Sequence, residues 1–209
     1  MLLVKQKKQW AGVILAGGES RRFGRPKAFA KFKEKYFFEF AMEALAPLAD
    51  KIMIISHPSL TDRFNRQTAV KVLEDLPPYQ GNGPLSGLYS AMKQSHAEWY
   101  VVLPCDMPLI TAEVVSQLAA AADESVDAVI PIINGKIHPL VAVYHRRVLP
   151  IVTEQLASGN YRMIDMIRKI TVKERTEADL LSADTLFQNI NTKDAYSQLF
   201  TGKSCDPLT

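Results

Sequence analysis

The sequence predicts an α/β fold, with helices on both faces of a mostly parallel twisted sheet that forms a single three-layer domain. Short apolar runs that end in turn residues alternate along the chain with longer runs of helical periodicity. The chain has 209 residues, a length at which one domain buries a single core efficiently. We expect the domain to span residues 1–200 and a polar tail to occupy residues 201–209.

The predicted strands are apolar segments bounded by turn residues, and they are Ala11–Ala16, Lys51–Ser56, Lys71–Leu73, Trp99–Leu103 and Asp127–Ile132. The predicted helices are Phe37–Leu48, Leu85–Gln94, Thr111–Ala122, Val148–Ala157 and Thr192–Phe200. Pro47 is typical of a helix end, and Thr111 followed by Glu113 is typical of a helix start. Asn134-Gly135 indicates a hairpin, so residues 136–144 are predicted to return antiparallel to the strand before them.

The loop after the first predicted strand carries the strongest chemical signal, and it reads LAGGESRRFGRPK over residues 15–27. Gly17 and Gly18 allow backbone N–H groups to approach an anion closely, and Arg21, Arg22, Arg25 and Lys27 supply positive charge. A Walker A loop is excluded because Gly24 is not followed by Lys and a hydroxyl residue, and the G-x-G-x-x-G dinucleotide fingerprint is absent here. The loop therefore predicts a polyphosphate site.

Lys27 follows that loop, and a lysine there can fold back onto phosphates with its three N–H donors. Pro26 fixes the backbone before it and so directs the side chain. The alternative is a solvated surface lysine, which is the usual environment of this residue type.

Asp106 follows the apolar strand predicted at Trp99–Leu103, and Pro104 and Pro108 prevent that strand from continuing. Ligands of open α/β sheets bind at the carboxyl ends of the strands. A carboxylate beside a triphosphate is suited to hold Mg²⁺, which prefers oxygen ligands. The alternative is an aspartate that caps the helix beginning near Thr111.

Composition excludes several classes of protein. Hydrophobic residues make up 47% and charged residues 22%, as in ordinary soluble proteins, and no apolar run approaches the ~20 residues of a membrane span. Cys105 and Cys205 form no disulfide framework, which favours the cytoplasm. The net charge of +3 comes from dispersed basic residues and does not indicate nucleic-acid binding. No histidine has the spacing of a zinc site.

The loop resembles the L-A-G-G-x-S-x-R-M-G-x-D-K motif of molybdenum cofactor guanylyltransferases, GTP-dependent enzymes that attach GMP to molybdopterin. Further matches occur in family order between Gly12 and Leu199, at Glu74-Asp75, GPLSG (83–87), PCDMP (104–108), HPLVA (138–142) and NINT (189–192). Two residues depart from the motif: Phe23 replaces Met, and Pro26 replaces Asp. A Pro-Lys ending occurs in related cytidylyltransferases.

The resemblance implies a Rossmann-like nucleotidyltransferase fold, with GTP and molybdopterin as substrates and Mg²⁺ as cofactor. It implies catalytic roles for Lys27, Arg22 and Asp106, with Asp106 also binding the metal. The implied nucleotide contacts are Leu15, Ala16, Gly17, Gly18, Lys27, Ser56, Asp75, Gly83 and Asp106. His138, Asn189 and Asn191 would face the pterin; a half-buried strand histidine and an Asn-rich turn are the alternatives. We expect a cytoplasmic monomer with transient contacts to other cofactor-biosynthesis proteins.

Three alternative functions stay open at this point. A cytidylyltransferase of the same fold, acting on molybdopterin or another phosphorylated metabolite, is favoured by Pro26 and disfavoured by Gly17, which stands where such enzymes have a second Ala. An NAD-dependent oxidoreductase is disfavoured because the second strand ends in Ser56-His57, without an acid for a ribose hydroxyl. A nucleotide-binding module without turnover is disfavoured by the presence of Asp106 and Lys27.

Overall fold

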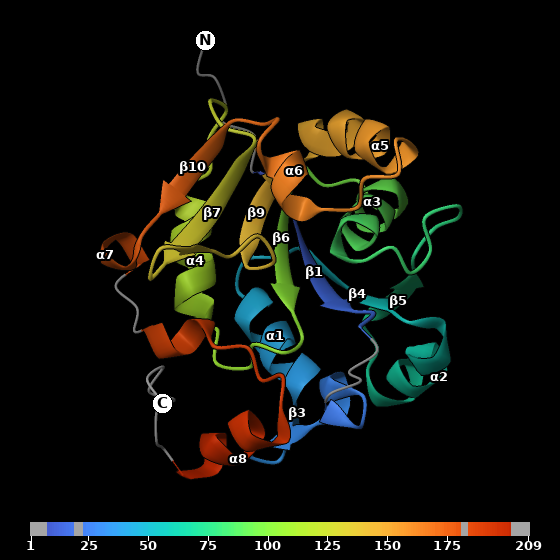
Figure 1. Ribbon diagram of the computed structural model, residues 1–209, viewed down its shortest axis with the longest axis vertical. Coiled ribbons are helices and arrows are strands. Elements are labelled where there is room, and N and C mark those ends of the chain that lie inside the picture. Colours follow the sequence, from blue (N-terminus) through green and yellow to red (C-terminus); the bar gives the residue numbers. More distant parts are fainter. Residues whose placement is uncertain (1–7, 19–22, 181–183, 202–209) are drawn as a thin grey trace.

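Parallel strands of apolar residues form the centre of the molecule (Figure 1). The computed structural model describes residues 8–18, 23–180 and 184–201. Its eight-stranded sheet has the order β10-β7-β9-β6-β1-β4-β5, with β8 paired to β7. The strands are β1 (Trp10–Ala16), β4 (Lys51–Ser56), β5 (Lys71–Glu74), β6 (Trp99–Pro104), β7 (Ala128–Ile133), β8 (Lys136–Ile137), β9 (Ala142–His145) and β10 (Val172–Arg175). Strands β2 (Lys31–Phe32) and β3 (Lys35–Tyr36) form a separate hairpin.

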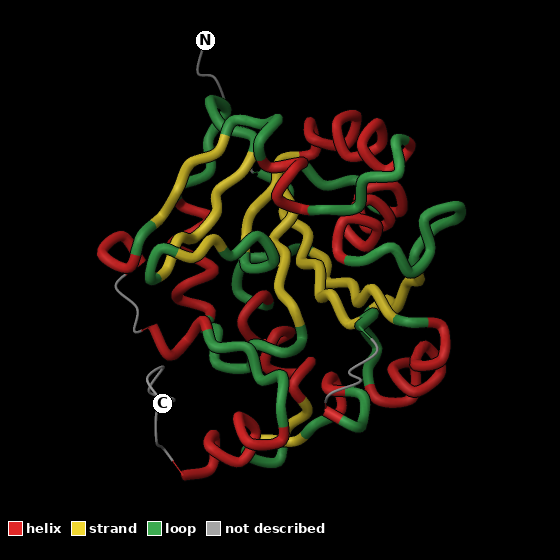
Figure 2. Tube along the Cα trace, in the orientation of Figure 1, coloured by secondary structure: helices red, strands yellow, loops and turns green. Residues whose placement is uncertain are grey.

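Helices cover both faces of the sheet, as Figure 2 shows by the red segments on either side of the yellow strands. The helices are α1 (Phe37–Leu45), α2 (Pro58–Gln67), α3 (Pro84–Gln94), α4 (Ala112–Ala120), α5 (Leu149–Ala157), α6 (Met163–Ile167), α7 (Glu177–Leu180) and α8 (Lys193–Thr201). The described residues also form three short 3₁₀ helices, Lys27–Phe29, Arg146–Val148 and Asp184–Phe187. The predicted three-layer α/β architecture is confirmed.

Alternating side chains of β1 divide the core in two. Ile14 and Ala16 pack with α1, α2 and α4, whereas Ala11 and Val13 pack with α3, α5 and α6. This two-sided burial explains why the strands read as continuous apolar runs. A Cβ added at Gly12 would lie 3.1 Å from Leu45 Cδ1, so glycine here permits α1 to approach the sheet closely.

The predicted elements agree with the structure to within a few residues, with one instructive difference in the hairpin. Asn134 and Gly135 adopt positive φ angles of 50° and 69°, as a tight hairpin requires. However, only β8 pairs with the end of β7 beyond this turn, because Pro139 provides no N–H for a continuous ladder. The chain then turns and returns as β9, which runs antiparallel to both β6 and β7.

Several elements were missing from the sequence prediction. Helix α2 is polar and buries only Phe64 among its residues, so it lacks the apolar stripe that reveals a helix. Strand β10 is an edge strand rich in charged residues. The described residues include no helix long and apolar enough to cross a membrane. Most of the predicted tail, residues 202–209, lies outside the described residues, so the domain boundary stays a prediction.

Candidate active site at the carboxyl edge of the sheet

The glycine loop begins where β1 ends. Gly17 and Gly18 follow Ala16 and are exposed to solvent. Arg21 and Arg22 lie outside the described residues, so the phosphate contact of Arg22 remains a prediction. Gly24 has φ +75°, a conformation that side chains rarely adopt, which explains the glycine at that position. Pro26, with φ −59°, precedes the 3₁₀ helix Lys27–Phe29 and accepts a hydrogen bond from Phe29 N.

Lys27 lies between two side chains that come from distant parts of the chain. Its Nζ donates to Asp106 Oδ2 and to Asn191 Oδ1, each at 2.6 Å. The Lys27 and Asp106 side chains are only 14% and 19% exposed, which weakens solvent screening of their charges. The solvated-lysine alternative therefore does not describe Lys27.

Backbone contacts hold these three segments together. Cys105 N donates to Leu15 O at 3.1 Å, which fixes the end of β6 beside the end of β1. Ile190 N donates to Asp106 O at 2.8 Å and so brings Asn191 to the same edge of the sheet. Thr111 is the N-cap of α4, and its Oγ1 accepts from Val114 N. Among the described residues, the Asp106 carboxylate caps no helix and instead contacts Lys27.

The Asp75 carboxylate lies beside Leu15 and Gly87. Its Oδ2 accepts from Gly81 N at 3.1 Å, whereas its buried Oδ1 has no hydrogen-bond partner among the described residues. Burial raises the pKa of Asp75, against the lowering effects of the Gly81 hydrogen bond and His57. A Cβ at Gly87 would lie 2.8 Å from Leu15 Cδ2 and 3.8 Å from Asp75 Oδ1, so this glycine leaves room beside the carboxylate.

Two other predicted nucleotide contacts, Ser56 and Gly83, lie in different environments. Ser56 is buried at the end of β4, and its hydroxyl donates to His57 O at 2.9 Å. Gly83 is exposed with φ +86° and precedes Pro84, the first residue of α3. Sequence reasoning missed Ser86, whose buried hydroxyl also has no partner among the described residues. Ser86 lies within the GPLSG segment (83–87), but only the glycine at its start was predicted as a contact.

The predicted pterin contacts are divided in space. Asn191 contacts Lys27 directly, whereas Asn189 is an exposed residue. His138 is only 9% exposed and its ring meets the ring of Phe187 edge-on, with 5.0 Å between centroids. Burial lowers the pKa of His138. His138 is thus buried and follows β8 instead of lying in a strand, and pterin binding by His138, Asn189 and Asn191 stays a prediction.

Cys105 is adjacent to Asp106 but is unsuited to nucleophilic chemistry. It is a buried free cysteine. Burial, reinforced by the negative charge of Asp106, raises the pKa of its thiol to about 12. The thiol is therefore protonated near neutral pH, and the thiolate that a nucleophile requires does not form.

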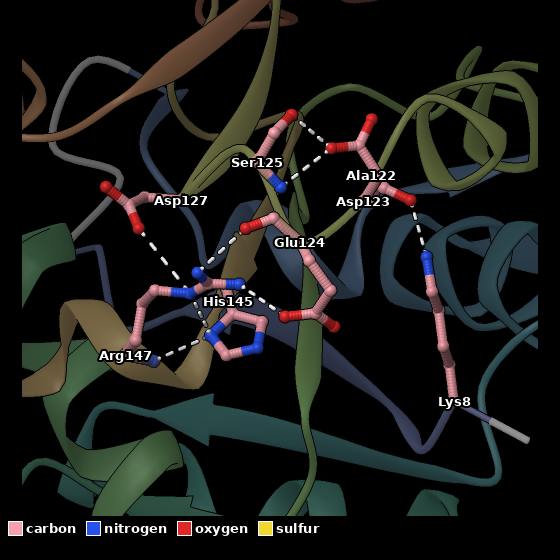
Figure 3. A network of polar contacts seen from close by, with 8 residues as sticks. All are labelled: Lys8, Ala122, Asp123, Glu124, Ser125, Asp127, His145 and Arg147. Atoms are coloured by element: carbon pink, nitrogen blue, oxygen red, sulfur yellow. Dashed lines mark hydrogen bonds and ion pairs between the residues drawn. The ribbon is translucent and has the colours of Figure 1, made fainter. Parts of the chain in front are cut away.

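A second polar network lies at the opposite edge of the sheet (Figure 3). Ligand atoms of Glu98, Glu124 and His145 lie within 4.8 Å of one another. Trp99, next to Glu98, is the first residue of β6 and pairs with His145, whereas Asp106 follows the far end of β6. Nδ1 of His145 accepts hydrogen bonds from two atoms of Arg147, the backbone N at 2.9 Å and the side-chain Nε at 2.8 Å. The neutral ring of His145 therefore carries its proton on Nε2. This pattern favours a polar network over a metal site.

A cavity of about 770 Å³ also lies at that opposite edge. Its lining includes Trp10, Lys51 and Lys71, which stand at the beginnings of β1, β4 and β5. Because ligands of open α/β sheets bind at the carboxyl ends of the strands, we assign the chemistry to the edge that carries Lys27 and Asp106.

Comparison with known proteins gives a consistent result. Residues 12–175 match the family model of the MobA-like NTP transferase domain. The chain is 47% identical over 191 residues to a "Probable molybdenum cofactor guanylyltransferase" of a Geobacillus strain, covering 91% of this chain and 98% of that one. It is 41% identical to a protein of the same name from Bacillus subtilis, covering 90% and 92% of the two chains.

Solved structures extend the comparison to the fold. Molybdopterin-guanine dinucleotide biosynthesis protein A from Archaeoglobus fulgidus superposes with a TM-score of 0.76 at 22% identity, covering 90% of this chain and 96% of that one. Together with the family match and the bacterial relatives, this likeness confirms the predicted fold and the predicted enzyme class. The chain therefore belongs to the MobA-like NTP transferase family of nucleotidyltransferases, and within it to the molybdenum cofactor guanylyltransferases.

Proposed function

We propose that this protein transfers GMP from GTP to molybdopterin or its molybdenum-loaded form, producing the guanine dinucleotide cofactor and pyrophosphate. The terminal phosphate oxygen of the pterin attacks the α-phosphorus of GTP, and the bond from that phosphorus to the β-phosphate oxygen breaks. The observation that carries the proposal is the contact of Lys27 with Asp106 beside the glycine loop. The names of the relatives support the choice of substrates.

The protein's contribution to this reaction is positioning and charge stabilisation. The attacking phosphate is already ionised, so it requires no strong base. The N–H groups of Gly17 and Gly18 would donate to phosphate oxygens, and the Lys27 ammonium would neutralise charge that develops on the phosphates. Arg22 is proposed to add a second cation from the same loop.

The residues beside Lys27 also fit a magnesium ion. The Asp106 carboxylate and the Asn191 amide both direct an oxygen at one point, the Lys27 ammonium, and oxygen is the ligand type that Mg²⁺ prefers. Asp106 would hold Mg²⁺, which when bound neutralises charge on the triphosphate.

The choice of guanine is supported by Asp75. Its Oδ1 is a buried acceptor that has no partner among the described residues, and leaving such a group unpaired costs about 1–3 kcal/mol. A ligand that brings N–H or O–H donors would satisfy it. Guanine presents N1–H and its amino group on one edge, and the ribose presents hydroxyls.

A cytidylyltransferase is the second candidate, favoured in the sequence by Pro26. In the structure, Pro26 has a local backbone role, because it begins the 3₁₀ helix that carries Lys27. That role does not depend on which base is bound, so it weakens the argument for cytosine. The buried acceptor of Asp75 favours the base with more donors on its edge.

A thermal-shift experiment with GTP, CTP, ATP and NAD in magnesium tests the proposed nucleotide. A ligand at 100 times its dissociation constant adds about 2.7 kcal/mol to the free energy of unfolding. We expect GTP to raise Tm most. Equal or greater stabilisation by CTP would favour the cytidylyltransferase, and stabilisation by NAD alone would reject nucleotidyl transfer. We also propose a cytoplasmic monomer that makes transient contacts with other cofactor-biosynthesis proteins.

A further inference from the structure

The Asp106 carboxylate already has a cation beside it in the free protein. Lys27 Nζ lies 2.6 Å from Oδ2, and both side chains are largely buried. The ion pair of Lys35 and Glu43 has the same 2.6 Å distance but is exposed, at 49% and 57%. Charges interact more strongly where water screens them less, so the Lys27–Asp106 pair is the stronger of the two.

A hydrogen bond to Asn191 Oδ1 holds Lys27 in this position. A divalent ion bound to Asp106 would stand within a few ångströms of the ammonium, and two cations at that distance in a partly buried site repel each other. Either the ammonium or the metal ion can therefore neutralise this carboxylate well, but both cannot do so together. A triphosphate changes this balance, because its oxygens offer the ammonium another anionic partner.

We propose that Lys27 and a divalent metal ion compete for Asp106 in the free protein, and that the nucleotide ends the competition by drawing Lys27 onto its phosphates. This inference rests on the proposed function, because it requires a triphosphate beside Lys27. The metal ion then binds together with the nucleotide rather than before it. By thermodynamic linkage, nucleotide and metal ion each raise the affinity of the other by the same factor.

Binding of Mn²⁺ alone, measured by the electron paramagnetic resonance of the free ion, tests the competition directly. Lys27→Met keeps the length and apolar stem of the side chain but removes its charge. We expect Lys27→Met to bind Mn²⁺ without nucleotide at least about tenfold more tightly than the wild-type protein does. Lys35→Met is the matched control, because it breaks an ion pair of equal length at the surface. It should bind Mn²⁺ as the wild-type protein does.

The double variant Lys27→Met, Asp106→Asn locates the gained site, and it should lose the added affinity. Equal or weaker Mn²⁺ binding by Lys27→Met would overturn the proposal, as would a gain that survives Asp106→Asn. A second measurement needs only the folded wild-type protein. Without nucleotide, Mn²⁺ should raise Tm no more in the wild-type protein than in Asp106→Asn. Mn²⁺ together with GTP should raise Tm more than GTP without a metal ion.

A rise in Tm with Mn²⁺ alone that disappears in Asp106→Asn would also overturn the proposal. The Mn²⁺ titration contains neither pterin nor nucleotide, so its outcome is independent of the acceptor and the base. If the competition holds but GMP transfer does not occur, the proposed substrates are wrong. If transfer occurs but Lys27→Met gains no affinity, only the competition is wrong.

Discussion

Lys27 Nζ and Asp106 Oδ2 lie 2.6 Å apart although 79 positions separate the two residues in the chain. The sheet explains this contact. Strands β1 and β6 are parallel neighbours, with Leu15 opposite Pro104, so the loop after one strand and the residue after the other meet at the same edge. The order of the strands thus brings these residues together. Variants of the site side chains can therefore be expected to change activity while leaving the fold intact.

Lys27→Ala should lower kcat/KM for GTP by roughly 10- to 100-fold, since a hydrogen bond to a charged group contributes about 1.5–3 kcal/mol. Both kcat and KM should change, because Lys27 would contact the phosphates before and during transfer. Steady-state kinetics of pyrophosphate release provide the measurement. Lys35→Ala serves as the control and should retain wild-type kinetics. Unchanged kinetics in Lys27→Ala would remove Lys27 from the site.

Asp106→Asn should leave the fold intact and lower kcat by about a thousandfold, because charge stabilisation by a bound metal ion contributes several kcal/mol in the transition state. Asparagine caps a helix about as well as aspartate, so a residue that only capped would tolerate the change. Pyrophosphate release at saturating magnesium is measured together with a melting curve. Release near the wild-type rate would exclude Asp106 as the metal ligand.

Asp75→Asn should weaken GTP binding by about tenfold while raising Tm of the free protein by a few degrees. The two effects have one cause. The buried Asp75 carboxylate binds the ligand, and without the ligand its burial lowers the stability of the fold. The gain in stability should depend on pH. Burial raises the folded-state pKa of Asp75 above 3.8, so the fold loses stability as pH rises from 3.8 towards that folded-state value, and the loss is complete above it.

Denaturant unfolding at several pH values checks this linkage. The wild-type protein should match Asp75→Asn most closely below pH 3.8, where the carboxyl is neutral in both states. The difference should grow as pH rises and reach its full size at neutral pH. A difference in the free energy of unfolding that stays constant from pH 3 to 8 would show that the Asp75 charge is not the cause.

Cys105 should resist alkylation in the native protein at pH 8, since its thiol has a pKa of about 12. The measurement uses a Cys205→Ser background, so that Cys105 is the single thiol, and mass spectrometry after iodoacetamide treatment. Full modification should appear after unfolding in denaturant. Rapid modification of the folded protein would show that the thiol is accessible and ionised.

The sequence was sufficient to predict the central parallel strands and the carboxyl edge of the sheet. Apolar runs such as β4 are visible because both faces of the strand are buried, and Asp106 is visible because prolines end its strand. Helix α2 was not predicted because it packs through little more than Phe64. Charged residues likewise concealed edge strand β10.

Contacts between side chains were harder to predict than elements. The contact of Asn191 with Lys27 was not predicted; it arises because Ile190 N donates to Asp106 O and so fixes the neighbouring residue at that place. The missing partners of Asp75 Oδ1 and Ser86 Oγ depend on how α3 packs beside β1. Packing of this kind cannot be predicted from local patterns in the sequence. The positions of residues 19–22, which include Arg22, lie outside the described residues.

Transfer of a labelled nucleotide tests the central claim most directly. The protein is incubated with molybdopterin, magnesium and either GTP or CTP labelled at the α-phosphate, and the pterin product is separated and counted. We predict that label from GTP enters a pterin dinucleotide with one pyrophosphate released for each transfer, and that CTP gives at least tenfold less product. Labelling of the pterin by CTP in preference to GTP, or by neither nucleotide, would contradict the account.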